Sequence, residues 1–557
     1  MKILLSGAGI TSNTLAHFLT RQGHILTILE RAPTLRDTGL QIDLRGPGVE
    51  VIRRMGLEGA LKAKTIQEEG IQVVDKVGRR RAWFPVSSGG DAAQIKGGGG
   101  TGVGTGKKGK ERKTSLTTEW EVMRGDLCRL LFDSAQKGLK QGQGKGKVEY
   151  RFGTSIEGLR ERVDGVDVRF STGEQEEFDL VIGGDGQNSK VRGLLIAERE
   201  RQRRLSQGQQ HAQLDQGDDG QTDPFKPLGV YAGLFTTSWP PLPDTPSSSS
   251  SQSTQPTPDS DSNKLIGTVY LAPSQRAIFT RRHHPHRIQV YLFCRTDSPA
   301  FAELRQGHMD PAKEKALLMR HFESAGWETD RLMKALEEAE DFYCERIGFV
   351  KMEGWSSLSA LPSTLRSSST GSASASASAI TAEEPGTGAD GDPTSYTGGR
   401  IVLVGDAAYA PSVTTGMGTT AGVVGAYVLA GEIGKYCTAE PTRALPSSSS
   451  EPTKSTPESS STSTTTSNTD IQKAILNYER TLRPFITYIQ KDLSEGKSAW
   501  DSLPETKLGV GLWNAMLGVC SWLRVDTFGG WVRDEIYKAK GEKGWVLPDY
   551  KGWKERD

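Results

Sequence analysis

The first thirty residues place the strongest constraint on the fold of this chain. Residues 2–6 form a short apolar run, Gly7-Ala8-Gly9 is a turn, and apolar side chains from Ile10 to Leu19 recur at helical spacing. Residues 24–29 then have the composition of a second buried strand, which ends at Glu30. In such a unit Gly7 makes the tight turn, Gly9 lets a pyrophosphate approach the backbone, and Glu30 can accept hydrogen bonds from a ribose diol. The pattern therefore predicts a dinucleotide-binding fold.

Two details qualify this prediction. The third glycine of the usual pattern is replaced by Ser12, whose side chain is still small enough for close packing of helix against strand. A second glycine-rich stretch, at 97–108, contains Gly106-Lys107 but lacks the spacing of a phosphate-binding loop and the Ser or Thr after the lysine. We interpret that stretch as a linker.

The composition of the chain divides it into folded and low-complexity sequence. Of its 557 residues 35% are hydrophobic and 25% charged, which is typical of a globular protein diluted by polar segments. Five segments rich in Ser, Gly, Pro and Gln cannot bury enough apolar surface to offset chain entropy. We expect them to be disordered insertions, at 87–115, 196–225, 240–263, 357–397 and 440–470. The remaining sequence fits a two-domain enzyme.

Charge and cysteine content limit the partners and the compartment. A formal net charge of +1 gives no long-range attraction for nucleic acid, so we expect a small-molecule partner and no nucleic acid. Five widely spaced cysteines favour a reducing compartment, and no apolar run is long enough for a transmembrane segment. A cytoplasmic location is predicted. Peripheral membrane contact through the apolar segment 508–523 is the lesser alternative to a helix that closes the substrate cavity or packs on the nucleotide domain.

Two further motifs follow apolar strands. Residues 178–184 (FDLVIGG) lead into Asp185-Gly186, and residues 401–404 lead into Gly405-Asp406. After Pro411 a run of small residues, Thr415 to Thr419, opens an apolar helix. Each acidic residue therefore follows the carboxyl end of a strand, which is the position where open parallel sheets bind their ligands.

Together these motifs resemble the group A FAD-dependent monooxygenases, the para-hydroxybenzoate-hydroxylase-like family. The chain looks closest to the branch that holds tetracycline-inactivating and fungal secondary-metabolite monooxygenases. Lesser matches are GLQIDLRG at 39–46, the arginine of EVMRGDL, VKMEGW at 350–355 and YERTLRPF at 478–485. The resemblance implies an α/β fold, in which a Rossmann-like FAD-binding domain is interleaved with an antiparallel-sheet substrate domain and followed by C-terminal helices.

The resemblance also implies roles for individual residues. Glu30 and Arg31 are expected at the adenosine end of FAD, Asp43 and Arg124 against the cofactor, and Asp185 in support of the site. Asp406 is expected to bond the ribityl chain, while the backbone at Gly416, Gly418 and Thr419 faces the flavin pyrimidine. Tyr409 stands where many relatives carry histidine.

The predicted division of the chain follows from the motifs and the insertions. The FAD-binding domain is expected in three parts, at 1–86, 116–195 and 398–439, the substrate-domain sheet and helix at 226–356, and a C-terminal helical region at 471–557. Within the substrate domain we predict strands at 228–237, 265–272, 276–282 and 287–295, the last with one buried face, and a helix over 310–341 with Ala316 on its buried face. His283, His284 and His286 could meet a zinc ion, but no Cys or carboxylate stands at ligand spacing, so we expect a surface turn and no metal. No general base can be identified.

These observations predict an FAD-dependent monooxygenase that uses NADPH or NADH and O2. By the resemblance, a flavin C4a-hydroperoxide inserts one oxygen atom into a small aromatic or polyketide- or terpenoid-type metabolite, by hydroxylation, epoxidation or Baeyer–Villiger insertion. The alternatives are a flavin-dependent dehydrogenase or reductase of the same fold and a non-enzymatic flavin-binding scaffold.

Overall fold

The computed structural model describes most of the sequence outside the predicted insertions. The described residues are 1–36, 39–85, 120–140, 146–206, 224–238, 265–284, 286–302, 310–358, 398–437, 468–495, 499–522 and 545–550. The predicted insertions at 87–115 and 240–263 lie outside the described residues, as do most of those at 357–397 and 440–470.

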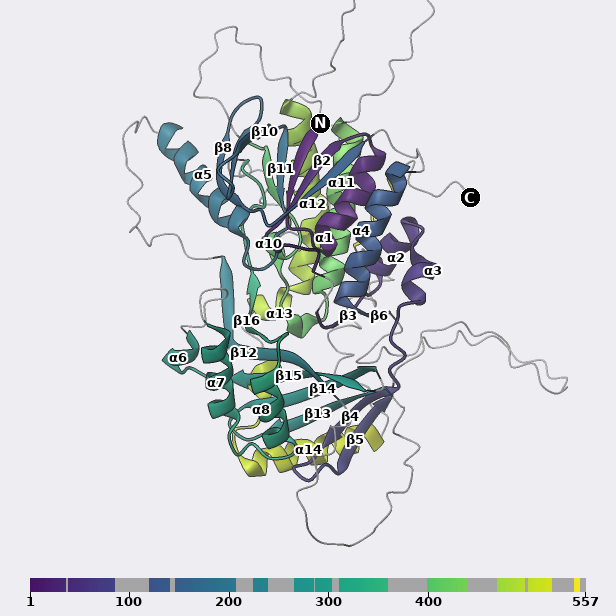
Figure 1. Cartoon of the computed structure of the whole chain (residues 1–557), viewed down its shortest axis with the longest axis vertical. Helices are drawn as coiled ribbons and strands as arrows, with labels where there is room; N and C mark the ends of the chain where they lie inside the picture. Colours follow the sequence, from purple (N-terminus) through teal and green to yellow (C-terminus); the bar gives the residue numbers. More distant parts are fainter. Residues whose placement is uncertain are drawn as a thin grey trace, which may run out of the picture.

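A parallel five-stranded sheet forms the core of the first domain. Its order is β17 (Ile401–Leu403), β11 (Leu180–Gly183), β1 (Lys2–Ser6), β2 (Ile25–Glu30) and β7 (Lys147–Phe152). The middle strands are apolar on both faces, as expected where helices cover a parallel sheet. Helix α1 (Ile10–Arg21) packs between α4 (Arg124–Lys140) and α11 (Gly418–Cys437), and α12 (Asn468–Ile489) packs against α11. Figure 1 shows this domain in the upper half of the molecule.

Smaller elements complete the first domain. They are the strand pair β3 (Gln41–Asp43) and β6 (Glu121–Met123), the strands β8 (Ile156–Glu161), β9 (Val166–Phe170) and β10 (Gln175–Phe178), and the helices α2 (Pro47–Arg54), α3 (Glu58–Lys62), α5 (Lys190–Ser206) and α10 (Asp406–Tyr409). The 3-10 turn η3 (Val413–Thr415) and α13 (Lys491–Ser494) follow later in the chain.

The second domain is built on a seven-stranded sheet. Its order is β16 (Tyr343–Val350), β12 (Phe225–Ser238), β15 (Arg287–Arg295), β14 (Arg276–His284), β13 (Ile266–Ala272), β4 (Gly70–Val74) and β5 (Arg80–Pro85). Neighbouring strands are antiparallel except β13 and β4, which are parallel. Because β4 and β5 precede α4 in the sequence, the chain passes between the two domains more than once. The predicted interleaving is confirmed.

Helices cover both faces of this second sheet. On one face lie α6 (Pro299–Ala302), α7 (Pro311–Phe322) and α8 (Thr329–Glu338), and on the other lie η4 (Ala499–Ser502) and α14 (Lys507–Trp522), seen at the bottom of Figure 1. The expectation of one buried face on β15 was wrong, because residues 288–292 are all buried, on one side by α7 and α8 and on the other by first-domain residues that include Leu40 and Gln41. Among the described residues, α14 packs mainly on β5 and also on β4 and β13 of the second sheet.

The single helix predicted over 310–341 is divided in two. Ser324 and Gly326 adopt positive φ of 56° and 95° and end α7, so α8 starts in a new direction. Ala316 is exposed, and Leu318 takes the buried position instead. None of the described helices is long and apolar enough to cross a membrane.

Several predicted insertion boundaries were wrong, since β12 and α12 also begin inside predicted insertions, at Phe225 and Asn468. α5 continues to Ser206, past the predicted start at 196, because Glu198 accepts the Glu161 N–H (3.2 Å) and Arg199 Nε donates to the Ser356 carbonyl (2.8 Å). Ser357, the first residue of another predicted insertion, is fully buried. Polar composition alone does not reveal such tertiary contacts.

Candidate functional site

The predicted motifs meet at one edge of the parallel sheet. Gly7 follows β1, Glu30 ends β2, Asp185 follows β11, and Asp406 follows β17. These four strands are neighbours and run parallel, so their carboxyl ends lie side by side. Residues that are far apart in the sequence therefore form one continuous surface, as open α/β sheets use for ligands.

The glycine loop is shaped for a close-lying ligand. Gly7 has a φ of 89°, and a Cβ at this position would lie 3.0 Å from the Asp185 Cα, so only glycine fits. A Cβ on Gly9 would meet nothing within 4 Å, which leaves open space at the start of α1. No side chain caps α1 at its N-cap Gly9, so the N–H groups of its first turn can bind an anion.

Ser12 occupies the place of the third glycine without disturbing the packing. Its side chain is buried against the loop after β11, where a Cβ on Gly184 would lie 2.5 Å from the Ser12 Oγ. Gly184 therefore supplies the space that the motif usually gains from its third glycine. This compensation explains why the departure from the motif leaves the fold intact.

Glu30 lies against the glycine loop. One carboxylate oxygen accepts the Ala8 N–H and the other accepts the Ala32 N–H, both at 3.0 Å. An ionised carboxylate has about four acceptor positions, so two remain for the hydroxyls of a ribose. Arg31, the next residue, is exposed at the rim of the site.

Asp185 fixes the loop that follows β11. Its carboxylate accepts from the Ser189 Oγ (2.5 Å) and the Val191 N–H (3.1 Å), and so holds the start of α5. Burial raises the pKa of Asp185, and these hydrogen bonds oppose the rise. The contacts fit a supporting role more closely than direct contact with a ligand.

Arg192 is a buried link that the sequence motifs alone did not reveal. Its guanidinium donates to the Ala407 carbonyl (3.1 Å) and to the Gln187 carbonyl (2.7 Å), and so joins the loops that contain Asp185 and Asp406. The only signal in the sequence was that Arg192 stands shortly after the Asp185-Gly186 pair.

Two glycines bring the loop of Asp406 onto the glycine loop. A Cβ on Gly405, which has a φ of 66°, would lie 2.7 Å from the Thr11 Oγ1. A Cβ on Gly422 would lie 2.6 Å from the same atom. The starts of α1 and α11 therefore converge at Thr11, and both offer N–H groups to one ligand.

Asp406 lies at the centre of this arrangement. The residue is exposed to water, yet surrounding protein raises the pKa of its carboxyl to about 6, against the smaller opposing effect of Arg124. Together these properties place the carboxylate in a recess and not on the outer surface. Gly418, at the start of α11, lies close enough that its Cβ would be 4.0 Å from Asp406 Oδ1. Gly416 adopts a left-handed φ of 61°, and Thr419 is half-buried in the first turn of α11.

Basic side chains complete the recess. Arg124 packs beneath Gly39, and its Nη1 is buried without a hydrogen-bond partner among the described residues. Asp43 forms an ion pair with Arg45, whose backbone N–H donates to the Thr420 Oγ1 (2.9 Å). A buried donor that lacks a partner costs free energy, so Arg124 is suited to a ligand with acceptor atoms.

These features fit the FAD that the sequence predicts. The open space at Gly9 fits a pyrophosphate, Glu30 can accept from the adenosine ribose, and Asp406 can accept from the ribityl hydroxyls. Arg124 and the start of α11 offer donors to the polar atoms of a flavin ring.

Tyr409 turns away from this recess. It is buried between Trp355 and Tyr478, and its hydroxyl lies 3.2 Å from the Tyr478 hydroxyl. Gly425 makes room for the ring, since a Cβ there would lie 1.8 Å from the Tyr409 hydroxyl. The residue that replaces histidine is therefore part of the core.

Sequence reasoning also missed Glu345, a half-buried acid on β16. Burial and the charge of Asp406 raise its pKa to about 7. The interaction with Asp406 crosses the boundary between the two domains. The charged pair Glu345-Arg346 within an otherwise largely apolar strand was the only signal in the sequence.

The second sheet presents aromatic side chains toward this recess. The Tyr291 ring lies 5.3 Å from Phe279 and 6.3 Å from Phe293, and Phe293 lies 4.9 Å from Trp500. Leu40, from the first domain, packs on the same face. This face can hold an apolar, flat molecule next to the motifs of the first domain.

Comparison with known proteins agrees with this arrangement. Residues 1–212 match the model of the family described as FAD binding domain. The chain is 30% identical to the FAD-dependent monooxygenase asL4 of Sarocladium schorii over 551 residues, which cover 99% of this chain and 98% of that protein. It is 29% identical to the flavin-dependent monooxygenase eupH of Phoma sp, over 99% of this chain and 98% of that protein.

Solved structures share the fold at lower identity. The tetracycline destructase Tet(55) matches with a TM-score of 0.57 and 20% identity, over 99% of this chain and 98% of its own. HpxO of Klebsiella pneumoniae, complexed with FAD and uric acid, matches with a TM-score of 0.54 and 15% identity, over 96% of each chain. With full-length similarity to asL4 and the motifs in place, the chain belongs to the family of FAD-dependent monooxygenases.

Proposed function

We propose that this monooxygenase uses NADPH or NADH and O2 to place one oxygen atom in a small aromatic or polyketide-type metabolite. The observation that supports this substrate class is the aromatic face formed by Phe279, Tyr291 and Phe293, which packs with Leu40 of the first domain. Offset aromatic contacts stabilise a flat conjugated molecule and fix its orientation. Bound FAD would supply the redox and oxygen chemistry, and the chain's own residues would position the substrate and exclude water.

The proposed roles follow the positions of the site residues. Glu30 and Arg31 hold the adenosine end, Asp406 holds the ribityl chain, and Arg124 and the backbone from Gly416 to Thr419 hold the flavin ring. Asp43 keeps Arg45 in place beside the ring, and Asp185 fixes its loop. The reductant visits transiently in this proposal, which agrees with the single dinucleotide loop, at Gly7, in the sequence.

Isotopically labelled O2 tests the proposal. Purified protein with NADPH or NADH is incubated with a panel of phenols and aromatic polyketides, and the products are analysed by mass spectrometry. We expect one labelled oxygen atom in a product of at least one compound class. Reductant-dependent conversion without any label in the product would instead support a flavin-dependent dehydrogenase or reductase.

A further inference from the structure

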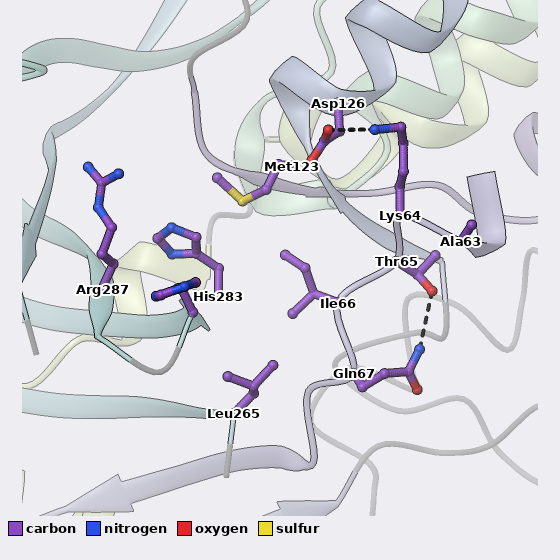
Figure 2. A pocket seen from close by; sticks show the side chains of 11 residues that line it. Ala63, Lys64, Thr65, Ile66, Gln67, Met123, Asp126, Leu265, His283 and Arg287 are labelled. Atoms are coloured by element: carbon purple, nitrogen blue, oxygen red, sulfur yellow. Dashed lines mark hydrogen bonds and ion pairs between the residues drawn. The ribbon is translucent and has the colours of Figure 1, made fainter. Parts of the chain in front are cut away.

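A pocket of about 560 Å³ lies where the two domains meet. Figure 2 shows its walls: the linker 63–67 between α3 and β4, Met123 and Asp126 near the start of α4, and His283 and Arg287 on the β14–β15 hairpin. The volume is within the range of about 300–1,000 Å³ that small-molecule sites occupy. Because its walls come from both domains, the pocket depends on their relative position.

The charges in the pocket are not balanced. Lys64 Nζ and Asp126 Oδ1 lie 2.9 Å apart and compensate each other. Arg287 is exposed on the hairpin and forms no ion pair within the described residues, and Asp126 is the only acidic side chain among the residues that line the pocket. His283 adds a buried Nδ1 that has no hydrogen-bond partner in the described part of the chain. The uncompensated groups favour an anionic ligand.

Part of the lining is apolar, beside the polar side chains of Thr65, Gln67 and His284. Ile66, Leu265 and Met123 face the same space as Arg287 and His283, as Figure 2 shows. An inorganic ion would leave this surface in contact with water. A molecule with an apolar body and one anionic group could contact both the apolar and the basic lining residues.

A short chain of contacts joins the pocket to the aromatic face. Gln289 Nε2 donates to the Met123 Sδ (3.7 Å), and Gln289 Oε1 accepts from the Tyr291 hydroxyl (3.1 Å). Arg124, the residue after Met123, points its side chain at Gly39 on the flavin side. A ligand in the pocket is therefore separated from the proposed substrate surface by the Met123 and Gln289 side chains.

We propose that this pocket binds a small organic anion with an apolar body, held by Arg287 and His283. Two molecules in the reaction share this chemistry, an aromatic carboxylate or phenolate substrate and the phosphate-bearing reductant. The link through Gln289 to the aromatic face favours the substrate, which would occupy the pocket on its way to the flavin. The site itself rests on its geometry, and the identity of its ligand rests on the proposed function.

The titration of His283 offers an independent readout. Its pKa is lowered by burial first, then by the positive charges of Arg287 and His284, while Asp341 raises it. Lys64 and Asp126 face the same pocket from the linker and from α4. An anion bound between Arg287 and His283 would favour the protonated imidazole, so the pKa of His283 is expected to rise on binding.

Calorimetry on the FAD-loaded, full-length protein tests the site. The probes are salicylate, an aromatic carboxylate, and 2′,5′-ADP, which carries the phosphates of NADPH. The variants are Arg287→Ala and His283→Ala, with Arg320→Ala on the exposed side of α7 as the matched control. We expect salicylate to bind the wild type and the control equally, and to lose at least tenfold in affinity in Arg287→Ala.

Each result has a defined meaning. A rise of the His283 pKa in NMR titrations with salicylate, absent in Arg287→Ala, would support direct contact. Binding of 2′,5′-ADP but not salicylate, lost in Arg287→Ala, would assign the anion site to the reductant. Failure of both probes to bind the wild type, or equal affinity in Arg287→Ala, would overturn the proposal. FAD content is measured separately for the wild type and the variants. A wild type that does not bind FAD would contradict the proposed function and not the pocket.

Discussion

Glu345 on β16 and Asp406 at the start of α10 interact across the boundary between the two domains. β16 and α10 are held together by the Val350 N–H, which donates to the Ala410 carbonyl (2.9 Å), and by Gln490, which donates to the carbonyls of both residues. Burial, followed by the charge of Asp406, raises the pKa of Glu345 to about 7. The negative charge of Asp406 thus disfavours the ionisation of Glu345.

This relationship predicts a pH-dependent stability of the FAD-free protein. A carboxyl whose pKa is raised on folding binds more protons in the folded state, so stability falls as pH rises from its ordinary pKa toward 7. Glu345→Gln removes that loss. We expect the variant to gain about 1–3 kcal/mol over the wild type at pH 8 and almost nothing at pH 4.5. Thermal unfolding across this range measures the difference, with Glu174→Gln, an exposed acid, as the control. A gain that does not change with pH would contradict the prediction.

Glu30 is expected to stabilise both the glycine loop and the bound cofactor. Glu30→Ala removes the acceptor of the Ala8 and Ala32 N–H groups and the proposed acceptor of the ribose. The loss of a charged acceptor costs about 1.5–3 kcal/mol, so FAD affinity should fall roughly tenfold to a hundredfold. Flavin fluorescence titration measures the dissociation constant. Glu30→Gln keeps one acceptor oxygen and should lose less. An unchanged affinity in Glu30→Ala would place the ribose elsewhere.

Asp406 is expected to affect chemistry more than Glu30 does. In the proposed site its carboxylate anchors the ribityl chain next to the reacting ring, and a displacement of about 1 Å can cost on the order of a hundredfold in rate. Asp406→Ala, saturated with FAD, should turn over slowly and release most reducing equivalents as hydrogen peroxide, whereas saturated Glu30→Ala should remain largely coupled. The measurement is peroxide formed per NADPH consumed, once a substrate is known. Equal coupling in the two variants would remove Asp406 from the flavin site.

The parts of the fold that sequence could predict are those with local signals. Three such signals are apolar runs that end at a glycine or a carboxylate. They are the strand and turn at Gly7, the strand that ends at Glu30 and the strand before Asp406, and each lies where it was expected. Their convergence follows from one rule, that neighbouring parallel strands end at the same edge. The sequence could therefore predict that these motifs lie together, while the roles of their residues toward FAD stay a prediction.

The remaining features depend on contacts between distant segments. Nothing near Ser12 in the sequence indicates that Gly184 makes room for it, and nothing near Glu345 indicates that Asp406 lies opposite. The two buried faces of β15 result from α7 and α8 on one side and, on the other, from first-domain residues such as Leu40 and Gln41, which are distant in the sequence. Alternation of apolar and polar residues in a strand predicts one buried face. It carries no information about whether other segments also cover the second face.

The pair Tyr409 and Gly425 predicts a compensating double substitution. Gly425→Ala places a Cβ 1.8 Å from the Tyr409 hydroxyl in a rigid part of the core, and should destabilise the protein by roughly 1–3 kcal/mol or more. Tyr409→Phe alone loses the contact with the Tyr478 hydroxyl, at a cost of about 1 kcal/mol. In the double variant the closest clash is absent, so the total cost should be smaller than the sum of the two. Additive costs in chemical denaturation would show that the ring lies elsewhere.

The last prediction concerns the segment between β16 and β17. Ser357 is fully buried. Its Oγ donates a hydrogen bond to Glu161 Oε1 (2.8 Å) and accepts hydrogen bonds from the N–H groups of Gly399 (2.9 Å) and Ile401 (3.2 Å). The described ends of the segment thus lie together, and a short linker can join them, because loop-closure entropy changes slowly with length. Replacing residues 361–394 with a short Gly-Ser linker should leave the FAD content and Tm nearly unchanged. Ser357→Ala in the full-length chain should instead lower the unfolding free energy by about 1–3 kcal/mol, since it leaves buried groups without a partner. Loss of FAD from the linker variant, with a stable Ser357→Ala, would show that the replaced residues and not Ser357 are structural.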